Sequence, residues 1–322
     1  MNNPVVRVGI LGCASIARRS LVPAFAAHSS FSVAAVASRT CEKAAELART
    51  CGARPTTYDE LVSAPDVDLV YCPLPTGLHH FWVKRCLLAG KHVLCEKSLA
   101  CTAAEAFELV ELARARGLFL MESFQFRFHA QNVRVRQLLD SGKIGKIRQV
   151  SVRFGFPPFP DGPANIRYHR ELGGGALLDA GAYAVKATQF ILGPQLEVVS
   201  ASSWTDPGAE VDLGGSISFR ASDGAVSHAA YGFDNFYRCG YDIWGSRGVI
   251  STTRAFTARS GFHAPVSVET DEGTTVETFD DDHFARMLDH VAASIRAGTF
   301  ETELEDCRLQ AALLQAAREA AS

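Results

Sequence analysis

The sequence predicts an α/β protein in which a parallel sheet is followed by an α+β part with a large, mostly antiparallel sheet. Two observations predict this fold class. Up to about residue 122, short β-branched runs alternate with helical stretches rich in Ala, Leu and Glu, which is typical of βαβ units. Beyond that point, longer alternating strands follow one another with few helices between them, which indicates an antiparallel or mixed sheet. We therefore expect two domains, 1–122 and 123–322.

The elements of the first domain are expected in strict alternation. Strands are predicted at 5–11, 32–37, 69–72, 92–95 and 119–122, and helices near 16–27, 42–51, 58–63, 80–89 and 103–116. Gly90 and Gly117 stand where the last two of these helices should end, as glycines at helix C-termini do. Pro23 lies inside the first helical stretch and should kink or shorten that helix.

The second domain is expected to begin with a helix near 129–141 and to contain another near 176–192. Its strands are predicted at 147–154, 195–204, 216–220, 226–231, 239–244, 248–252 and 266–270, and two helices near 281–297 and 303–321 should end the chain. Such a sheet has few helices to cover it. We expect it to leave an apolar face open, and an open apolar face favours a homo-oligomer.

Composition excludes several classes of protein. The formal net charge is −3 and charged residues make up 21% of the chain, so we expect no nucleic-acid or membrane partner. The start of the sequence leads directly into a strand-like run without a signal-peptide pattern, which favours a cytoplasmic protein. The nine cysteines contain no C-x-x-C pair, so we expect no metal site.

A softened glycine motif follows the first strand. Gly12, Cys13, Ala14, Ser15, Ile16 and Ala17 read G-x-A-x-x-A. Gly12 permits a tight turn, Ala14 is small enough for a pyrophosphate to approach, and Ala17 allows close helix packing. Free N–H groups at the helix start would face the phosphates. The alternative interpretation is a tight β–α turn with no ligand.

The second strand ends in Ser38 and Arg39, with Lys43 beyond. A site selective for NAD usually has an acidic residue here to accept a hydrogen bond from the ribose 2′-hydroxyl. That residue is missing, and an arginine can grip a 2′-phosphate. We therefore expect NADP(H), and the alternative is an exposed arginine with no such role.

Three later segments carry candidate chemistry. The run 71–80 contains Pro73-Leu74-Pro75-Thr76 and two histidines, and Glu96-Lys97 directly follows an apolar strand. Both belong at the carboxyl edge of the sheet, where ligands bind in such folds. Gly173–Gly175 indicates a flexible loop closing over a ligand. Asp179 and Tyr183 then share a helix face, and a tyrosine near a lysine can donate a proton to a developing alkoxide. A structural tyrosine capped by Asp179 remains the alternative.

Together these segments resemble the Gfo/Idh/MocA oxidoreductase family over nearly the whole chain. The resemblance rests on the motifs VGILGCASIA, PLPTGLHH, AGKHVLCEKSLA, ESFQFRFHAQ, IGKIRQV and NIRYHRELGGGALLDAGAY. It implies a Rossmann dinucleotide-binding domain and a substrate-binding domain with an open-faced sheet, which often forms homodimers or homotetramers.

The resemblance also implies roles for single residues. Lys97 and Tyr183 match catalytic positions, and Lys97, Asp179 and Tyr183 match substrate-binding positions. The cofactor-lining positions are matched by the 12–17 turn, Ser38, Arg39, Leu74, Thr76, His79, Glu96 and Lys97, and less closely by Tyr58 and Arg167. Ser98 departs from the family motif E-K-P, and serine should lose the fixed φ and the possible cis bond of that proline.

The run 231–239, followed by 243–246, is similar to NADP-dependent reductases of nucleotide-linked 3-keto-deoxyhexoses, which serve deoxysugar and antibiotic biosynthesis. Phe236 and Tyr237 would stack on a sugar or base, or simply pack in the sheet. One alternative is an NADP-dependent dehydrogenase of a free aldose or a cyclic diol. Another, from a different class, is a non-catalytic dinucleotide-sensing regulator, against which both Lys97 and Tyr183 argue. The acidic run Asp280–Asp282 before His283 is expected to cap the helix that follows it.

Overall fold

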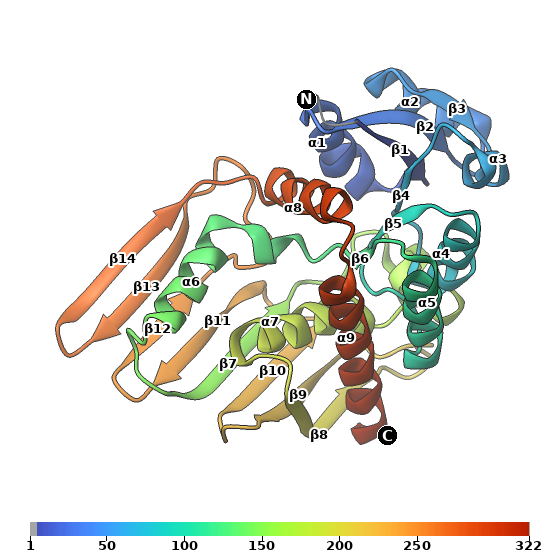
Figure 1. The fold of residues 1–322 in the computed structure, drawn as a ribbon. Coiled ribbons are helices and arrows are strands. Elements are labelled where there is room, and N and C mark those ends of the chain that lie inside the picture. The colour runs from blue at the N-terminus through green and yellow to red at the C-terminus, as the bar shows by residue number, and fades with distance from the viewer. Residues whose placement is uncertain (1–4, 322) are drawn as a thin grey trace. The chain divides into compact units, whose positions relative to one another are not determined.

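The computed structural model describes residues 5–321 and divides into two compact units. The first comprises Met1–Ser123 and Phe284–Ala311, and the second Phe124–His283 and Ala312–Ser322. Each unit is built on one sheet, of six and eight strands (Figure 1). The expected fold class, a parallel sheet followed by a mostly antiparallel one, is confirmed.

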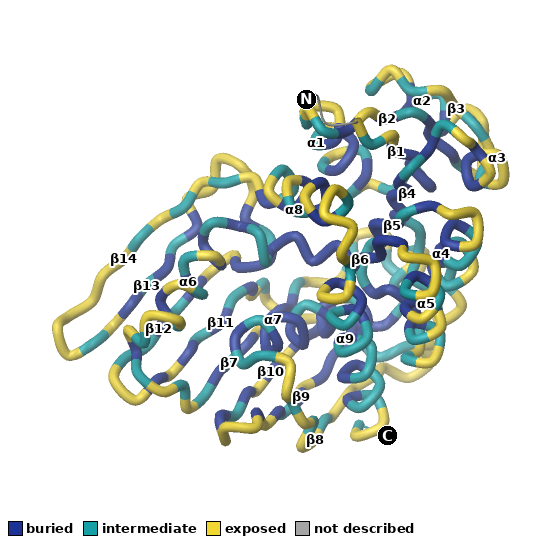
Figure 2. The backbone as a smooth tube through the Cα atoms, in the orientation of Figure 1, coloured by how far each residue is buried: buried dark blue, intermediate teal, exposed yellow. Residues whose placement is uncertain are grey.

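All neighbouring strands of the first sheet run parallel, in the order β3-β2-β1-β4-β5-β6. The strands are β1 (Val6–Leu11), β2 (Phe31–Ala37), β3 (Arg54–Thr56), β4 (Leu69–Cys72), β5 (His92–Cys95) and β6 (Leu120–Glu122). The helices are α1 (Val22–Ala27), α2 (Cys41–Cys51), α3 (Tyr58–Ser63), α4 (His79–Leu88) and α5 (Ala103–Arg116), with α8 (His283–Ala297) and α9 (Glu301–Ala320) at the end of the chain. The central strands are buried along most of their length (Figure 2).

Side-chain caps explain where α3 and α5 begin. Thr57 and Thr102 each accept a hydrogen bond from the backbone N–H three residues on, and the glutamate there bonds back to complete a capping box. Gly117 adopts the left-handed conformation that ends α5, as expected. Pro23 stands in the first turn of α1, and a π-helical turn, Ala17–Leu21, precedes it. Of the two expected effects, a kink or a shorter helix, the structure shows the shorter α-helix.

Two features of the first unit were not expected. Strand β3 has only three residues and contains Pro55. It lies at the edge of the sheet, where a proline is tolerated because its missing N–H can face away from the neighbouring strand. The expected boundary assigned residues 284–311 to the second domain, whereas these residues pack with the first unit. Leu304 and Cys307 of α9 lie in its apolar core.

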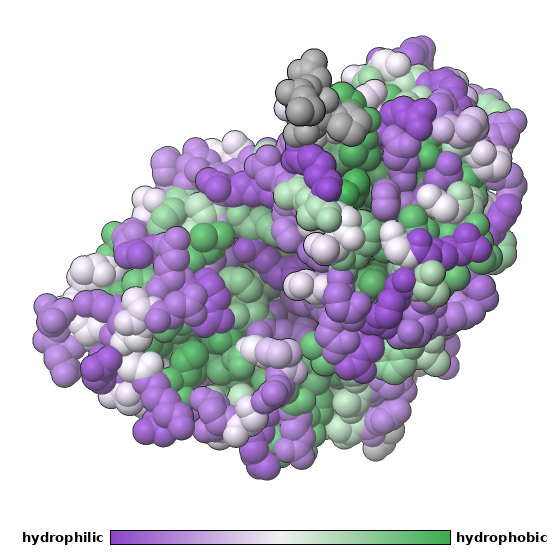
Figure 3. Space-filling view, viewed as in Figure 1, coloured by the Kyte–Doolittle hydropathy of each residue, from purple (hydrophilic) through white to green (hydrophobic). Residues whose placement is uncertain are grey.

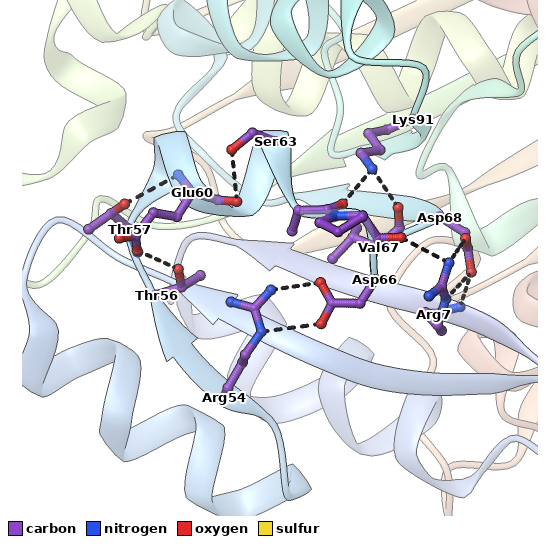
Figure 4. A network of polar contacts seen from close by, with 12 residues as sticks. Arg7, Arg54, Thr56, Thr57, Glu60, Ser63, Asp66, Val67, Asp68 and Lys91 are labelled. Atoms are coloured by element: carbon purple, nitrogen blue, oxygen red, sulfur yellow. Dashed lines mark hydrogen bonds and ion pairs between the residues drawn. The ribbon is translucent and has the colours of Figure 1, made fainter.

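A polar network fixes the loop that leads into β4 (Figure 4). Arg7 pairs with Asp68 at 2.6 Å and Arg54 with Asp66 at 2.8 Å. The buried Lys91 ammonium donates to the carbonyl oxygens of Ala64 and Val67 at 2.6 and 2.8 Å, and burial lowers the pKa of Lys91. These contacts set the start of β4, whose other end carries candidate site residues.

The second sheet has the order β14-β13-β12-β11-β7-β10-β9-β8 and is antiparallel except between β7 and β10. Its strands are β7 (Ile147–Gly155), β8 (Leu196–Trp204), β9 (Gly214–Ala221), β10 (Val226–Gly232), β11 (Arg238–Gly245), β12 (Gly248–Thr252), β13 (Ala264–Thr270) and β14 (Gly273–Phe279). Helices α6 (Ala130–Asp140) and α7 (Ala182–Leu192) pack on one face (Figure 1). Strand β14 was not predicted because its GTTVETF sequence is polar and mostly exposed. The turn before it is hydrophilic in Figure 3.

The opposite face of this sheet is not the apolar surface that was expected. Alternating side chains such as Val152, Phe219 and Ile243 are buried on the helix side. The uncovered side carries small polar and charged groups, whose cross-strand pairs include Ser202–Ser216, Ser218–His228 and Arg153–Asp242. Its large apolar exceptions include Trp244, which is 61% exposed, Trp204, 44% exposed, and Val276, 61% exposed. The Trp204 ring leaves no room for a Cβ on Gly214. The expectation of an open apolar face was wrong because most apolar residues of these strands are buried beneath the helices.

Among the helices that the structure describes, none combines the length and the apolar character that crossing a bilayer requires.

Candidate active site

The glycine motif forms the turn that the sequence predicts. The Gly12 N–H donates to the Ala37 carbonyl at 3.0 Å, and its φ of +126° is a conformation that L side chains rarely adopt. A Cβ at this position would lie 2.9 Å from Cδ2 of Leu74. Only glycine therefore fits. Gly12 itself is buried, whereas Cys13 and Ala14 are partly exposed and Ser15 is exposed, so the backbone after the turn is open to a pyrophosphate.

Residues at the ends of β1 and β2 converge beside this turn. The Cys13 thiol lies 3.5 Å from the Lys43 carbonyl oxygen, and Ser38 hydrogen-bonds to that thiol. Arg39 is exposed, and its backbone hydrogen-bonds to the half-buried Tyr58, whose pKa is raised by burial. The nearby acidic residues of α3 are engaged elsewhere: Asp59 pairs with Arg85 and Glu60 with Thr56. These residues fit an adenosine ribose that carries a phosphate.

Lys97 follows β5 in a segment that is anchored on both sides. The carboxylate of its neighbour Glu96 accepts a hydrogen bond from the Tyr71 hydroxyl at 2.7 Å, and burial raises the pKa of Glu96, against the opposing effects of Tyr71 and Lys97. The Leu99 N–H donates to the buried Glu122 carboxylate at 2.8 Å. The Lys97–Ser98 peptide bond is cis. The expectation that serine at this position loses the cis bond is therefore wrong.

His79 is placed differently from the expected cofactor-lining position. Its side chain is fully buried, with Nδ1 2.7 Å from the Ser98 carbonyl oxygen and Nε2 2.7 Å from that of Leu74. Burial lowers the pKa of this imidazole, and its two backbone partners oppose that effect. Both ring nitrogens are thus engaged by the protein itself. Leu74 and Thr76, by contrast, are only partly buried.

Within residues 5–321, one group of side chains has the donor set of a soft metal. The donor atoms of Cys72, His79 and Cys95 lie within 4.8 Å of one another, and all three residues are buried. A ligating imidazole must offer a lone pair, whereas each nitrogen of His79 faces a carbonyl oxygen. These three residues therefore do not form a prepared metal site.

In the second unit, Tyr183 stands in the first turn of α7 inside a cage of aromatic rings. Phe124, Phe154 and Phe256 have centroids 5.4, 5.3 and 5.7 Å from the tyrosine ring. The Tyr183 hydroxyl lies 3.4 Å from the side-chain amide of Gln125. Sequence analysis missed Gln125, although it lies within the ESFQFRFHAQ motif. The three phenylalanine rings hold the Tyr183 ring in place, and its hydroxyl points towards the Gln125 amide.

The three glycines before α7 serve close packing, where the sequence suggested a flexible loop. Their N–H groups donate to the carbonyls of Arg170, His169 and Arg167. A Cβ on Gly174 would overlap the Arg167 carbonyl, and one on Gly175, whose φ is +111°, would overlap the Asp212 carboxylate. That carboxylate accepts a hydrogen bond from the Leu177 N–H at 2.7 Å. Asp212 therefore caps the helical segment that carries Tyr183, and no local motif marks it.

Asp179 and Arg167 form an ion pair of 2.5 Å. Both belong to the second unit, so Arg167 is tied to the predicted substrate residue. The Arg167 guanidinium also lies 4.8 Å from the centre of the Phe159 ring, and burial lowers its pKa. Asp179 is four residues before Tyr183, so the ion pair lies about one helical turn from the tyrosine.

Two carboxylates of the acidic run before His283 bind backbone N–H groups outside the helix that follows them. Asp281 accepts a hydrogen bond from the Ala130 N–H, at the start of α6, at 2.7 Å, and Asp280 accepts one from the Gly261 N–H at 2.7 Å. These carboxylates thus bind segments far away in the sequence. Burial and the neighbouring His129 lower the pKa of His283 to about 4.

Comparison with known proteins identifies the family. A family model described as an oxidoreductase family with an NAD-binding Rossmann fold matches residues 6–124, and one described as the GFO/IDH/MocA C-terminal domain matches residues 132–251. The chain belongs to the Gfo/Idh/MocA oxidoreductase family. This confirms the resemblance seen in its motifs.

Several similar proteins of the Gfo/Idh/MocA family are reductases of nucleotide sugars. The chain is 43% identical to dTDP-3,4-didehydro-2,6-dideoxy-alpha-D-glucose 3-reductase of Saccharopolyspora spinosa, over 93% of this chain and 90% of that protein. A 3-ketoreductase from Actinomadura kijaniata, crystallised in complex with NADP and TDP-benzene, is 37% identical with a TM-score of 0.93, over 99% and 98% of the two chains. A D-xylose 1-dehydrogenase (NADP(+)) of Haloferax volcanii is 34% identical over 90% and 89%.

Proposed function

We propose that this oxidoreductase uses NADPH to reduce a keto group on a nucleotide-linked 3-keto-deoxyhexose. The similarity over nine-tenths of both chains to a reductase of such a sugar carries this proposal. It is supported by the similar 3-ketoreductase crystallised with NADP and TDP-benzene. It is also supported by Ser38 and Arg39 at the end of the second strand, where an NAD-selective site would have an acidic residue. We place the enzyme in the cytoplasm and in deoxysugar biosynthesis of the kind that serves antibiotics. Its nine cysteines, an odd number with no C-x-x-C pair, suit a reducing compartment.

In this proposal the residues 12–17, Ser38, Arg39 and Tyr58 hold the cofactor, with Leu74, Thr76 and Glu96 beside it. Bound NADPH supplies a hydride to the carbonyl carbon. Tyr183 donates the proton to the carbonyl oxygen, and the Lys97 ammonium orients the substrate and stabilises the negative charge that develops on that oxygen. Asp179 binds the sugar. Its ion pair with Arg167 keeps the carboxylate in a fixed orientation.

A second function is favoured by one observation, the similarity to a D-xylose 1-dehydrogenase. A thermal-shift and turnover panel separates the two. We expect dTDP to raise the melting temperature by several degrees at about a hundredfold excess over its Kd, since a ligand that binds only the native state stabilises it by about 2.7 kcal/mol there. D-Xylose with NADP+ should give neither a shift nor turnover. Xylose oxidation without a response to dTDP would reverse the assignment.

We expect the unmodified protein to prefer NADP(H) to NAD(H), and Arg39→Ala to remove most of that preference. A charge-assisted hydrogen bond contributes about 1.5–3 kcal/mol, or roughly ten- to a hundredfold in affinity. Fluorescence titration with NADPH and NADH measures both constants. NADH binding should stay nearly unchanged, and Arg49→Ala, at an exposed arginine near the end of α2, should alter neither constant. Equal affinities of the unmodified protein for the two cofactors would contradict the prediction.

We also propose a homodimer or homotetramer assembled through the uncovered face of the second sheet. Its flat rows of small side chains and its exposed Trp204 and Trp244 support this. Light scattering at micromolar concentration should give a multiple of the 34.7 kDa chain mass. Trp244→Lys should shift the distribution towards the single chain. A single 34.7 kDa species for the unmodified protein would rule out the assembly.

A further inference from the structure

One buried imidazole joins two loops at the carboxyl edge of the first sheet. His79, the first residue of α4, reaches back to the Leu74 carbonyl in the loop after β4 and across to the Ser98 carbonyl in the loop after β5. Both N···O distances are 2.7 Å. The side chain has no exposed surface, and Ser98 is only 1% exposed. Water therefore offers the Ser98 carbonyl no ready replacement if the ring is lost.

The two ends of this bridge bear on different parts of the proposed site. Ser98 follows Lys97 directly, and the next N–H along the chain is held from the other side by Glu122 at 2.8 Å. The backbone after Lys97 is thus clamped between an imidazole and a carboxylate. At the other end, the Leu74 side chain packs so closely on the cofactor turn that a Cβ on Gly12 would lie 2.9 Å from it.

The geometry points to His79 as a positioning residue with two separable tasks. Its Nδ1 hydrogen bond aims Lys97, and its Nε2 hydrogen bond holds Leu74 against the turn that receives the cofactor. This inference rests on the proposed function, because it takes Lys97 as the lysine that acts on the substrate.

The chemistry of the ring allows the two tasks to be tested separately. Both partners are carbonyl oxygens, so the two bonds together require the doubly protonated, positively charged ring. Burial acts against that charge by lowering the pKa, and the two carbonyl partners act in its favour. A ring with one proton makes only one of the two bonds. An amide side chain can reproduce either half. The asparagine amide nitrogen lies at about the position of Nδ1, and the glutamine amide nitrogen lies near that of Nε2. His79→Asn therefore keeps the Ser98 bond, and His79→Gln keeps the Leu74 bond.

The experiment compares kcat with the Kd for NADPH, which is measured by fluorescence titration without any sugar. Leaving a buried carbonyl without its donor costs about five- to a hundredfold in an equilibrium or rate constant. We expect His79→Gln to lower kcat by this factor with an almost unchanged Kd. His79→Asn should raise Kd with an almost unchanged kcat, and His79→Leu should do both. His80→Asn and His80→Gln are matched controls, since His80 pairs with Glu108 at the surface, and they should change neither constant.

Several outcomes would overturn the inference. If Asn and Gln lower kcat and affinity alike, in proportion to a lower melting temperature, His79 is a general structural residue. If His79→Leu leaves both constants unchanged, the bridge positions nothing. If the variants do not fold, a long-range ¹⁵N–¹H spectrum of the unmodified protein decides: a buried histidine with both N–H groups protected supports the bridge, and a single N–H overturns it. Lys97→Met tests the proposed function separately, because its retention of turnover would refute the role of Lys97 and leave the Kd results standing.

Discussion

Tyr183→Phe lowers kcat by about 10²–10⁴ and leaves NADPH binding intact, if the tyrosine supplies the proton. The substitution removes only the hydroxyl. The ring keeps its packing against Phe124, Phe154 and Phe256, so the cage should hold the phenylalanine in the same place. Steady-state turnover at saturating substrate, with a separate NADPH titration, measures the two effects.

Tyr241→Phe is the matched control for this loss of a hydroxyl. The Tyr241 hydroxyl is buried and donates to Asn132 at 2.5 Å, so its removal should lower the free energy of unfolding by about 1–3 kcal/mol. It should leave kcat within a small factor of the parent. Equal losses of kcat in Tyr183→Phe and Tyr241→Phe would show that the effect of the former comes from stability.

Lys97→Met should lower kcat by a similar factor of about 10²–10⁴ and also weaken substrate binding. The change removes a donor and a positive charge beside the reacting carbonyl, so it acts on both the bound substrate and the developing negative charge. Lys84→Met is its control, because Lys84 pairs with Glu108 on the surface of the same unit. Initial rates over a range of substrate concentration separate kcat from KM.

Comparison of the two variants assigns the proton donor. A kcat of Tyr183→Phe within about tenfold of the parent, beside an inactive Lys97→Met, would make the lysine the donor and the tyrosine a binding residue. The pH profile of kcat gives a second measure, since the group that donates the proton sets the alkaline limb. If the alkaline limb of the kcat profile disappears in only one of the two variants, the residue replaced in that variant is the proton donor.

Sequence reasoning succeeded where the fold depends on local patterns. The β1 turn, the strand ends carrying Ser38 and Lys97, and the helix carrying Tyr183 could all be predicted, because alternation and spacing are short-range signals. Strands β3 and β14 escaped prediction since both lie at sheet edges. Edge strands need no continuous apolar run, and theirs contain proline or polar residues.

The supports of the predicted residues could not be found in the same way. Asp212 caps a helix 35 residues earlier in the chain, Glu122 holds an N–H 23 residues away, and Gln125 lies 58 residues from Tyr183. No local spacing records such contacts. His79 was expected to line the cofactor site, whereas in the structure both of its ring nitrogens contact backbone carbonyls. A motif identifies candidate residues, whereas their partners follow only from the fold.

The uncovered face of the second sheet also gives the protein an intrinsic fluorescence signal for association. Two of the three tryptophans of the chain, Trp204 and Trp244, lie on this face and are 44% and 61% exposed. Indole emission moves to shorter wavelength when water is removed, so docking of any partner there changes the colour of the intrinsic fluorescence. Replacing Trp82, the third indole, by phenylalanine would leave a signal that arises from this face alone. Because the signal needs no label, association could be followed at concentrations far below those that light scattering requires.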